Sequence, residues 1–174
     1  MHKCLEPFFS LNWVAVRGYR AAHWLWEHGL KNSAEVTSQL ILMITGVQIE
    51  PSARIGMDFH IAHPNGIVIG YSSEIGDGCT VYHQVTLGSS GGRGREIEGR
   101  IHPKLGNHVT LYAGAKIIGP IEIGDYVDVA ANAVVLDDVP PFAVVGGIPA
   151  KILRMKEHPE QTPGCNPRET GAVL

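Results

Sequence analysis

The sequence is poor in cysteine and has no long apolar run. Its three cysteines are odd in number, lie far apart and lack metal-ligand spacing: Cys4, Cys79 and Cys165. This pattern fits neither a disulfide framework nor a zinc motif, so we expect a reduced protein with no bound metal. The first residues, MHKCLE, lead into no secretory signal, and residues 40–44 are too few to span a bilayer. We therefore expect a cytoplasmic protein without stable membrane insertion.

Charge of one sign and aromatic side chains are also scarce. The 14 basic and 17 acidic residues give a net charge of −3, so no overall field attracts nucleic acid. Aromatic residues make up 7% of the chain, which suits a narrow core filled with aliphatic side chains. Glycine is abundant at 21 residues, as expected of a chain that turns a corner every few residues. The length of 174 residues allows one domain with a core of its own.

Aliphatic side chains recur at every sixth position through most of the chain. They form three series, with a two-residue shift between the first two: Ile49, Ile55, Ile61, Ile67; Ile69, Ile75, Val81, Leu87; and Leu105, Leu111, Ile117, Ile123, Val129, Val135. An α-helix needs apolar residues three or four apart, and a half-buried strand needs alternation. A period of six instead predicts a mainly β solenoid with three flat faces per coil, each a short strand and a turn.

The residues before the solenoid carry a different pattern. Residues 1–46 lack the period of six and predict a helical lead-in that packs on the first coil and covers its open edge. Within it, residues 13–30 predict a helix that Gly29 ends, and Ser33 predicts the N-cap of a second helix that Gly46 ends. The apolar side of that second helix is expected at Leu40, Ile41 and Ile44.

Residues 47–155 are predicted to form the solenoid domain. A Gly-rich stretch at about 88–101 cannot be regular core, and we predict that it projects from a corner as a loop. Residues 144–154 predict a last irregular strand and a short helix. Residues 156–174 turn polar and rich in proline, and are predicted to form a poorly ordered tail.

Two histidines are the first candidates for chemistry. His63 comes two residues after the inward-facing Ile61 and therefore points outward, where Pro64-Asn65-Gly66 predicts a corner. His102 lies where the projecting loop rejoins the core. The two histidines can meet near one corner or across a subunit boundary.

Several stretches resemble one family closely: IAHPNGIVIG (61–70), HQVTLGSSGG (83–92), IHPKLG (101–106), AGAKIIG (113–119) and GGIPAKIL (146–153). They resemble the serine acetyltransferase branch of the hexapeptide-repeat acyltransferases, over roughly residues 12–155. The resemblance implies a left-handed parallel β-helix with a short N-terminal helical segment, assembled as a homotrimer with active sites between subunits. It implies an O-acetyltransferase that uses acetyl-CoA as co-substrate, with L-serine as the first candidate acceptor.

The resemblance also assigns site residues. It makes His63 the general base on the acceptor hydroxyl, a role that suits imidazole because its pKa lies near neutrality. His102 contacts the acceptor or the transition state. The positions that contact the cofactor match Ala113, Gly114 and Ala131, and Lys151 is the expected phosphate contact. Gln48 occupies the position at which the family has an Asp that orients the base.

Other departures leave the acceptor and the function class open. Ala62 and Ile101 stand immediately before the two histidines, where the family usually has charged residues that bind serine. A sugar or polysaccharide hydroxyl, which needs no paired counter-charges, is therefore the alternative acceptor. Two remote alternatives are a γ-carbonic anhydrase-like zinc enzyme with His63, His83 and His102 as ligands, and a non-catalytic trimeric binding protein.

Overall fold

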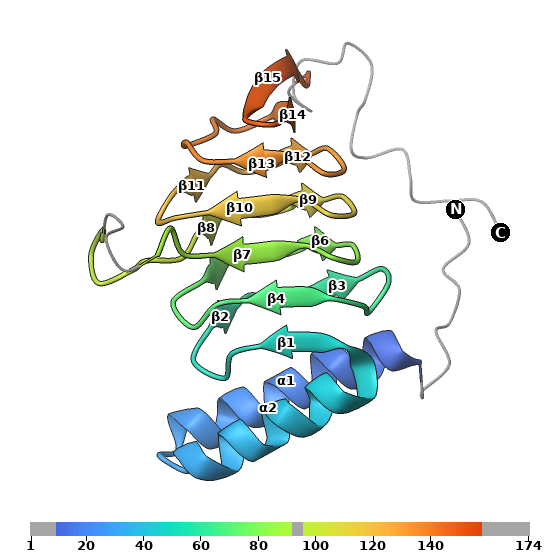
Figure 1. Ribbon diagram of the computed structural model, residues 1–174, viewed down its shortest axis with the longest axis vertical. Coiled ribbons are helices and arrows are strands. Elements are labelled where there is room, and N and C mark those ends of the chain that lie inside the picture. Colours follow the sequence, from blue (N-terminus) through green and yellow to red (C-terminus); the bar gives the residue numbers. More distant parts are fainter. Residues whose placement is uncertain (1–9, 92–95, 158–174) are drawn as a thin grey trace, which may run out of the picture.

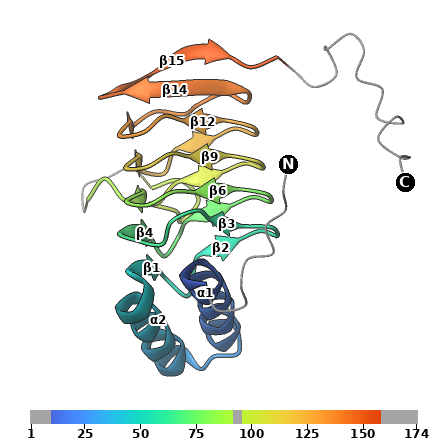
Figure 2. The ribbon, with the colours of Figure 1, turned by 90° about the vertical axis from the view of Figure 1, so that its right-hand side faces the viewer.

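The structure, a computed structural model, describes residues 10–91 and 96–157. It is a stack of β coils standing on two helices, α1 (Leu11–Glu27) and α2 (Lys31–Thr45), which lie side by side beneath the first coil (Figures 1 and 2). Each of the first four coils adds a short strand to each of three sheets, which we call faces A, B and C. The mainly β parallel solenoid predicted from the period of six is confirmed.

The three faces take their strands in rotation along the chain. Face A contains β1 (Val47–Ile49), β4 (Ile67–Ile69), β7 (Thr86–Gly88), β10 (Lys116–Ile118) and β13 (Val134–Val135). Face B contains β2 (Arg54–Ile55), β5 (Glu74–Ile75), β8 (Lys104–Leu105) and β11 (Glu122–Ile123). Face C contains β3 (His60–Ile61), β6 (Thr80–Val81), β9 (Thr110–Leu111), β12 (Asp128–Val129), β14 (Ala143–Gly147) and β15 (Ala150–Met155).

The aliphatic side chains of the repeat fill the interior of the stack and are buried in every coil. The two-residue shift in the repeat falls inside strand β4. Ile67 and Ile69 both point inward and are fully buried there, while Val68 between them is exposed. A three-residue strand on face A therefore holds two core positions, and the six-residue repeat continues from the second of them.

The carboxyl-terminal end of the stack differs from the prediction. All neighbouring strands are parallel except β14 and β15, which pair antiparallel. Residues 150–155 thus form a strand, and the predicted short helix there is wrong. Two adjacent apolar residues, Ile152 and Leu153, are both exposed, so their spacing gave no strand-like alternation. Beyond residues 156–157, the predicted tail lies outside the described residues.

The second helix begins earlier and packs differently than predicted. Its N-cap position is Leu30, not Ser33, and Gly46 ends it with a positive φ of 69° as expected. Leu40 and Ile44 are exposed, and the buried positions are Ala34, Ser38 and Thr45. The reason is close packing against the coil, because the Ser38 hydroxyl donates a 2.9 Å hydrogen bond to the Ile49 carbonyl oxygen. Within the described residues, no helix is long and apolar enough to cross a membrane.

Candidate active site

Two corners border face A and carry the predicted site residues. The chain enters face A through turns that we call the C–A corner: residues 62–66, 82–85, 112–115 and 130–133. It leaves face A through turns that we call the A–B corner: residues 50–53, 70–73, the segment between β7 and β8, and 119–121. The described parts of that segment, on either side of residues 92–95, extend away from the stack at one side (Figure 1).

His63 lies in the first turn of the C–A corner with its side chain exposed. Its ring contacts two rings of the next turn edge-on, with centroids 6.0 Å from Tyr82 and 5.9 Å from His83. The prediction that His63 points outward is therefore met by the geometry. His83 stands one coil above, and its Nδ1 is buried without a hydrogen-bond partner among the described residues. An accessible imidazole in this position can accept a proton from a ligand.

The predicted cofactor residues stack above His63 on the same corner. Backbone hydrogen bonds link successive turns, from Gln84 N to Asn65 O (2.8 Å), from Gly114 N to His83 O (2.9 Å) and from Asn132 N to Ala113 O (2.9 Å). Gly114 has a φ of 75°, and a Cβ there would lie 2.1 Å from Asn132 Oδ1, so a side chain at this position would be strained and would displace the Asn132 amide. The corner therefore presents a line of small residues: Ala113, Gly114 and Ala131.

Lys151 extends this line at the far end of face C. It lies in β15, is exposed, and pairs with Gly146 of β14. Face C places five strand spacings between β3, next to His63, and β15. At about 4.8 Å per spacing, the line of small residues rises about 24 Å from His63 to Lys151.

His102 lies at the A–B corner, beside the turns that lead from face A to face B. It is 7% exposed, in contrast to His63. Its ring lies directly over Gly70, where a Cβ would come within 2.0 Å of the His102 Cδ2 atom. The Tyr71 ring meets it edge-on at a centroid distance of 4.8 Å. Burial lowers the pKa of His102 below its usual value, an effect that the nearby Glu50 carboxylate partly opposes.

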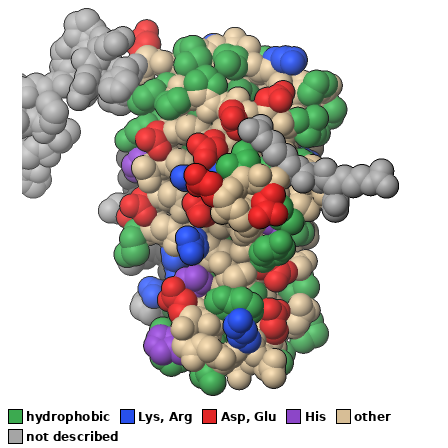
Figure 3. All heavy atoms as spheres, turned by 90° about the vertical axis from the view of Figure 1, so that its left-hand side faces the viewer, with side chains coloured by type: hydrophobic (Ala, Val, Ile, Leu, Met, Phe, Trp, Pro, Cys, Tyr) green, Lys and Arg blue, Asp and Glu red, His purple; other side chains and the backbone are tan. Residues whose placement is uncertain are grey.

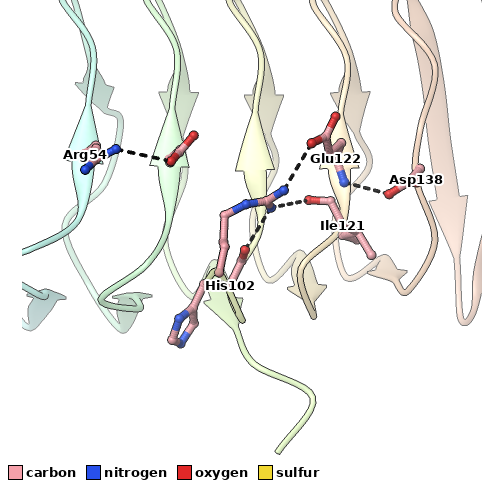
Figure 4. A network of polar contacts seen from close by, with 7 residues as sticks. Arg54, His102, Ile121, Glu122 and Asp138 are labelled. Atoms are coloured by element: carbon pink, nitrogen blue, oxygen red, sulfur yellow. Dashed lines mark hydrogen bonds and ion pairs between the residues drawn. The ribbon is translucent and has the colours of Figure 1, made fainter. Parts of the chain in front are cut away.

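Arg100 holds the backbone of His102 in place. Its guanidinium is buried, and Nη1 donates to the carbonyl oxygens of His102 (3.1 Å) and Ile121 (3.3 Å). Nη2 lies 3.1 Å from Glu122 Oε1, and Figure 4 labels three of the residues that this arginine joins: His102, Ile121 and Glu122. From the sequence, the arginines of the loop had no assigned place. Two partners of Arg100, Ile121 and Glu122, lie more than 20 residues away, so no local pattern could have located this side chain.

Ser72 is a second contact that the sequence did not reveal. Its hydroxyl oxygen lies 2.9 Å from His102 Nδ1 and also accepts hydrogen bonds from Ile101 N (3.1 Å) and His102 N (3.2 Å). A pocket of about 220 Å³ opens beside Ser72, with Arg54 and Glu74 among its lining residues. Acidic and basic side chains are interspersed over the face of the molecule in Figure 3.

Within one chain, the structure does not bring all the predicted site residues together. His63 and His102 lie at opposite corners of face A, so of the two possibilities left open by the sequence, a shared corner within the chain is wrong. Gln48 lies in β1, and its amide donates a 2.9 Å hydrogen bond to Glu50 Oε1. Among the residues that the structure describes, no three His, Cys, Asp or Glu side chains of a single chain are placed to hold a metal ion.

Comparisons with known proteins point in one direction. The family model "Bacterial transferase hexapeptide (six repeats)" matches residues 102–137. Serine acetyltransferase of Mycobacterium tuberculosis is 47% identical over 150 residues, which are 86% of this chain and 64% of that protein. Serine acetyltransferase of Helicobacter pylori is 46% identical over 135 residues, which are 78% of this chain and 77% of that protein.

Solved structures agree with these sequence matches. A crystal structure of serine acetyltransferase from Vibrio cholerae has a TM-score of 0.80 and 38% identity, covering 86% of this chain and 57% of that chain. A serine acetyltransferase in complex with CoA has a TM-score of 0.73 and 37% identity, covering 80% of this chain and 55% of that chain. The chain therefore spans little more than half the length of these two structures.

Proposed function

Because the chain belongs to the serine acetyltransferase family, we propose that it transfers the acetyl group of acetyl-CoA to a hydroxyl group of a small acceptor. The observation that carries this proposal is the line of small residues on the C–A corner, which leads from the exposed His63 to Lys151. The small residues at Ala113, Gly114 and Ala131 allow the pantetheine arm to approach the backbone there. Lys151 then meets the phosphate groups at the far end.

The chemistry needs one base and no metal. His63 takes the proton of the acceptor hydroxyl while the hydroxyl oxygen attacks the thioester carbonyl carbon. The new C–O bond forms, the C–S bond breaks, and the proton passes from His63 to the leaving sulfur of CoA. An exposed imidazole suits this step because it must reach both an acceptor and a cofactor that arrive from solvent.

We further propose that the active site forms between subunits of a homotrimer. His63 lies at one edge of face A and His102 at the other, so a single chain cannot place both on one acceptor. When the C–A corner of one copy packs against the A–B corner of the next, His63 of one copy comes close to His102 of the other. Gln48 lies in β1 on face A, and we propose that it orients the imidazole of His63 in this arrangement.

The acceptor is proposed to be L-serine, because the relatives that match most of this chain are named for it. A sugar hydroxyl is the second candidate, and a specific observation favours it. Ala62 and Ile101 carry no charge beside the histidines. Two nearby arginines are already paired, Arg100 with Glu122 and Arg54 with Glu74, so few charges remain for a zwitterion.

The test is an acceptor screen with acetyl-CoA that follows the release of free CoA thiol. L-Serine, homoserine and nucleotide sugars are compared side by side, with chelator-treated protein and a His63→Ala variant as controls. We expect release that depends on one acceptor, survives chelation and is nearly lost in the variant. No acceptor-dependent release, together with no acetyl-CoA binding by titration calorimetry, would overturn the proposal.

The oligomer is tested separately by light scattering in solution. A trimer of the 18.8 kDa chain has a mass of about 56 kDa, since 3 × 18.8 = 56.4. A monomer of 18.8 kDa would contradict an active site shared between copies.

A further inference from the structure

We propose that Ser72 fixes His102 in its Nε2–H tautomer and so makes His102 a hydrogen-bond donor to the reacting oxygen atoms, leaving His63 as the only base. The inference deepens the proposed function and rests on it for the identity of the reaction. It assigns a positioning role to a residue 30 positions away from the histidine that it serves.

The argument begins with a count of donors and acceptors on the Ser72 hydroxyl. A hydroxyl has one hydrogen to donate and two lone pairs that accept. The backbone N–H groups of Ile101 and His102 point at this oxygen from 3.1 Å and 3.2 Å and use both lone pairs. The single hydroxyl hydrogen is then free for only one further partner, the His102 Nδ1 atom at 2.9 Å.

It follows that Nδ1 of His102 is an acceptor. The Ser72 backbone N–H also points at Nδ1, at the longer distance of 3.4 Å. An imidazole that accepts at Nδ1 carries its hydrogen on Nε2. Protonating Nδ1 would set its hydrogen against the Ser72 hydroxyl, which has no lone pair left to receive it. The neutral Nε2–H form is therefore the one that this environment stabilises.

The surroundings hold the ring in one orientation. Gly70 lies beneath it without a Cβ, Tyr71 meets it edge-on, and Arg100 binds its carbonyl oxygen. The titratable or charged groups near His102 are Glu50, Tyr71 and Arg100. Burial lowers the pKa of His102, and only Glu50 acts to raise it.

The Nε2 atom of His102 is left for a ligand. Among the described residues, the buried side-chain nitrogen and oxygen atoms without a partner are Ser73 Oγ and His83 Nδ1. Nε2 of His102 makes no hydrogen bond to residues 10–91 or 96–157, and it is not one of these two buried atoms. Its N–H is therefore a fixed donor for the oxygen on which negative charge develops during acetyl transfer. No proton leaves His102 in this step.

The first experiment reads the tautomer directly and needs no turnover. Long-range proton–nitrogen NMR spectra of 15N-labelled protein distinguish a ring protonated at Nε2 from one protonated at Nδ1. The protein has nine histidines, so the His102 signals are assigned by their loss in a His102→Gln variant. We expect the Nε2–H pattern in the wild type. An Nδ1–H pattern, or a His102 that is charged at pH 7, would overturn the inference.

The second experiment uses variants in that same NMR experiment and in steady-state kinetics. Ser72→Ala removes the hydroxyl, and we expect kcat to fall about 10- to 100-fold, as when the partner that orients a functional histidine is lost. In the same variant, the pKa of His102 rises, because the hydroxyl no longer donates to Nδ1 and only the longer contact from the backbone N–H of residue 72 remains. Ser72→Thr keeps the hydroxyl and should restore the wild-type tautomer and rate.

Ser73→Ala is the matched control. Ser73 is the adjacent residue, 1% exposed, and its hydroxyl has no partner among the described residues. We expect the His102 tautomer, the pH profile and the kcat of Ser73→Ala to equal those of the wild type. A Ser72→Ala variant that keeps the wild-type His102 pKa and kcat would refute the role of Ser72. If no acceptor supports turnover, the proposed function fails, and the NMR result still decides the tautomer.

Discussion

The Tyr19 hydroxyl donates a 2.7 Å hydrogen bond to the carbonyl oxygen of Ala53, which joins helix α1 to the first coil. Both residues are buried, Tyr19 at 2% exposure and Ala53 at 0%. Burial raises the pKa of Tyr19 to about 12, so the hydroxyl stays protonated and remains a donor over the whole working range of pH. The bond fastens the helical lead-in at the end of the stack that β1 opens.

We predict that Tyr19→Phe lowers stability by about 1–3 kcal/mol, because the buried Ala53 carbonyl loses its donor and gains no water in exchange. Urea unfolding should show a lower midpoint with an unchanged slope. Tyr112→Phe serves as the control, since Tyr112 is exposed and stacks on Tyr82 through its ring alone. Equal midpoints for the two variants would show that the Tyr19 bond contributes nothing.

We predict that His63→Ala lowers kcat by about 10²–10⁴ and leaves the melting temperature unchanged. The exposed side chain fills no core space, so its removal should cost no stability. His60→Ala is the matched control, because His60 is also exposed and lies three residues earlier on face C. Turnover of His63→Ala at the wild-type rate would mean that another group is the base.

We predict that Lys151→Ala raises the dissociation constant for CoA about tenfold, the low end for a hydrogen bond to a charged group. Lys104→Ala is the control, since Lys104 is exposed on face B, away from the C–A corner. Titration with a CoA analogue that lacks the phosphate groups should remove the difference between Lys151→Ala and the wild type. A difference that persists would place Lys151 beside another part of the cofactor.

We predict that His102 makes the fold less stable as the pH falls below about 6.5. Burial lowers the pKa of His102 in the folded state, so between that lowered value and 6.5 the unfolded chain binds more protons. Stability must then decrease as the pH falls through this window, and the effect vanishes above it. Urea midpoints of the wild type and His102→Gln across pH 4–8 measure the effect as their difference. Parallel curves would contradict it.

The stack itself could be predicted from the sequence because each core position repeats a local rule. One aliphatic residue per face is enough to bury a short strand, and the rule needs no knowledge of distant residues. Ile67 and Ile69 already marked the longer strand of face A as an irregularity in the count. The same local reasoning failed at the second helix, where Ser38 packs on the coil through a hydrogen bond and Leu40 does not.

The candidate site was predictable only in part, for a physical reason. His63 could be identified because it lies two residues after a core isoleucine, so the outward direction of its side chain follows from the repeat. The surroundings of His102 depend on where a long segment rejoins the stack, and no periodic rule describes that return. At that return, Arg100 binds the carbonyl oxygen of Ile121, and Ser72 binds the ring of His102. Both contacts link separate coils.

At the C–A corner, each coil contributes one turn to the line between His63 and Lys151, so the number of coils sets the length of that line. Adding or deleting a whole coil would change the length by about 4.8 Å and leave the chemistry at each end untouched. The antiparallel strand β15 limits the number of coils, because a strand that reverses the chain direction cannot begin another coil. Under the proposed function, the fold therefore suits a long, thin ligand of one particular span, whose two ends meet residues nearly 90 positions apart.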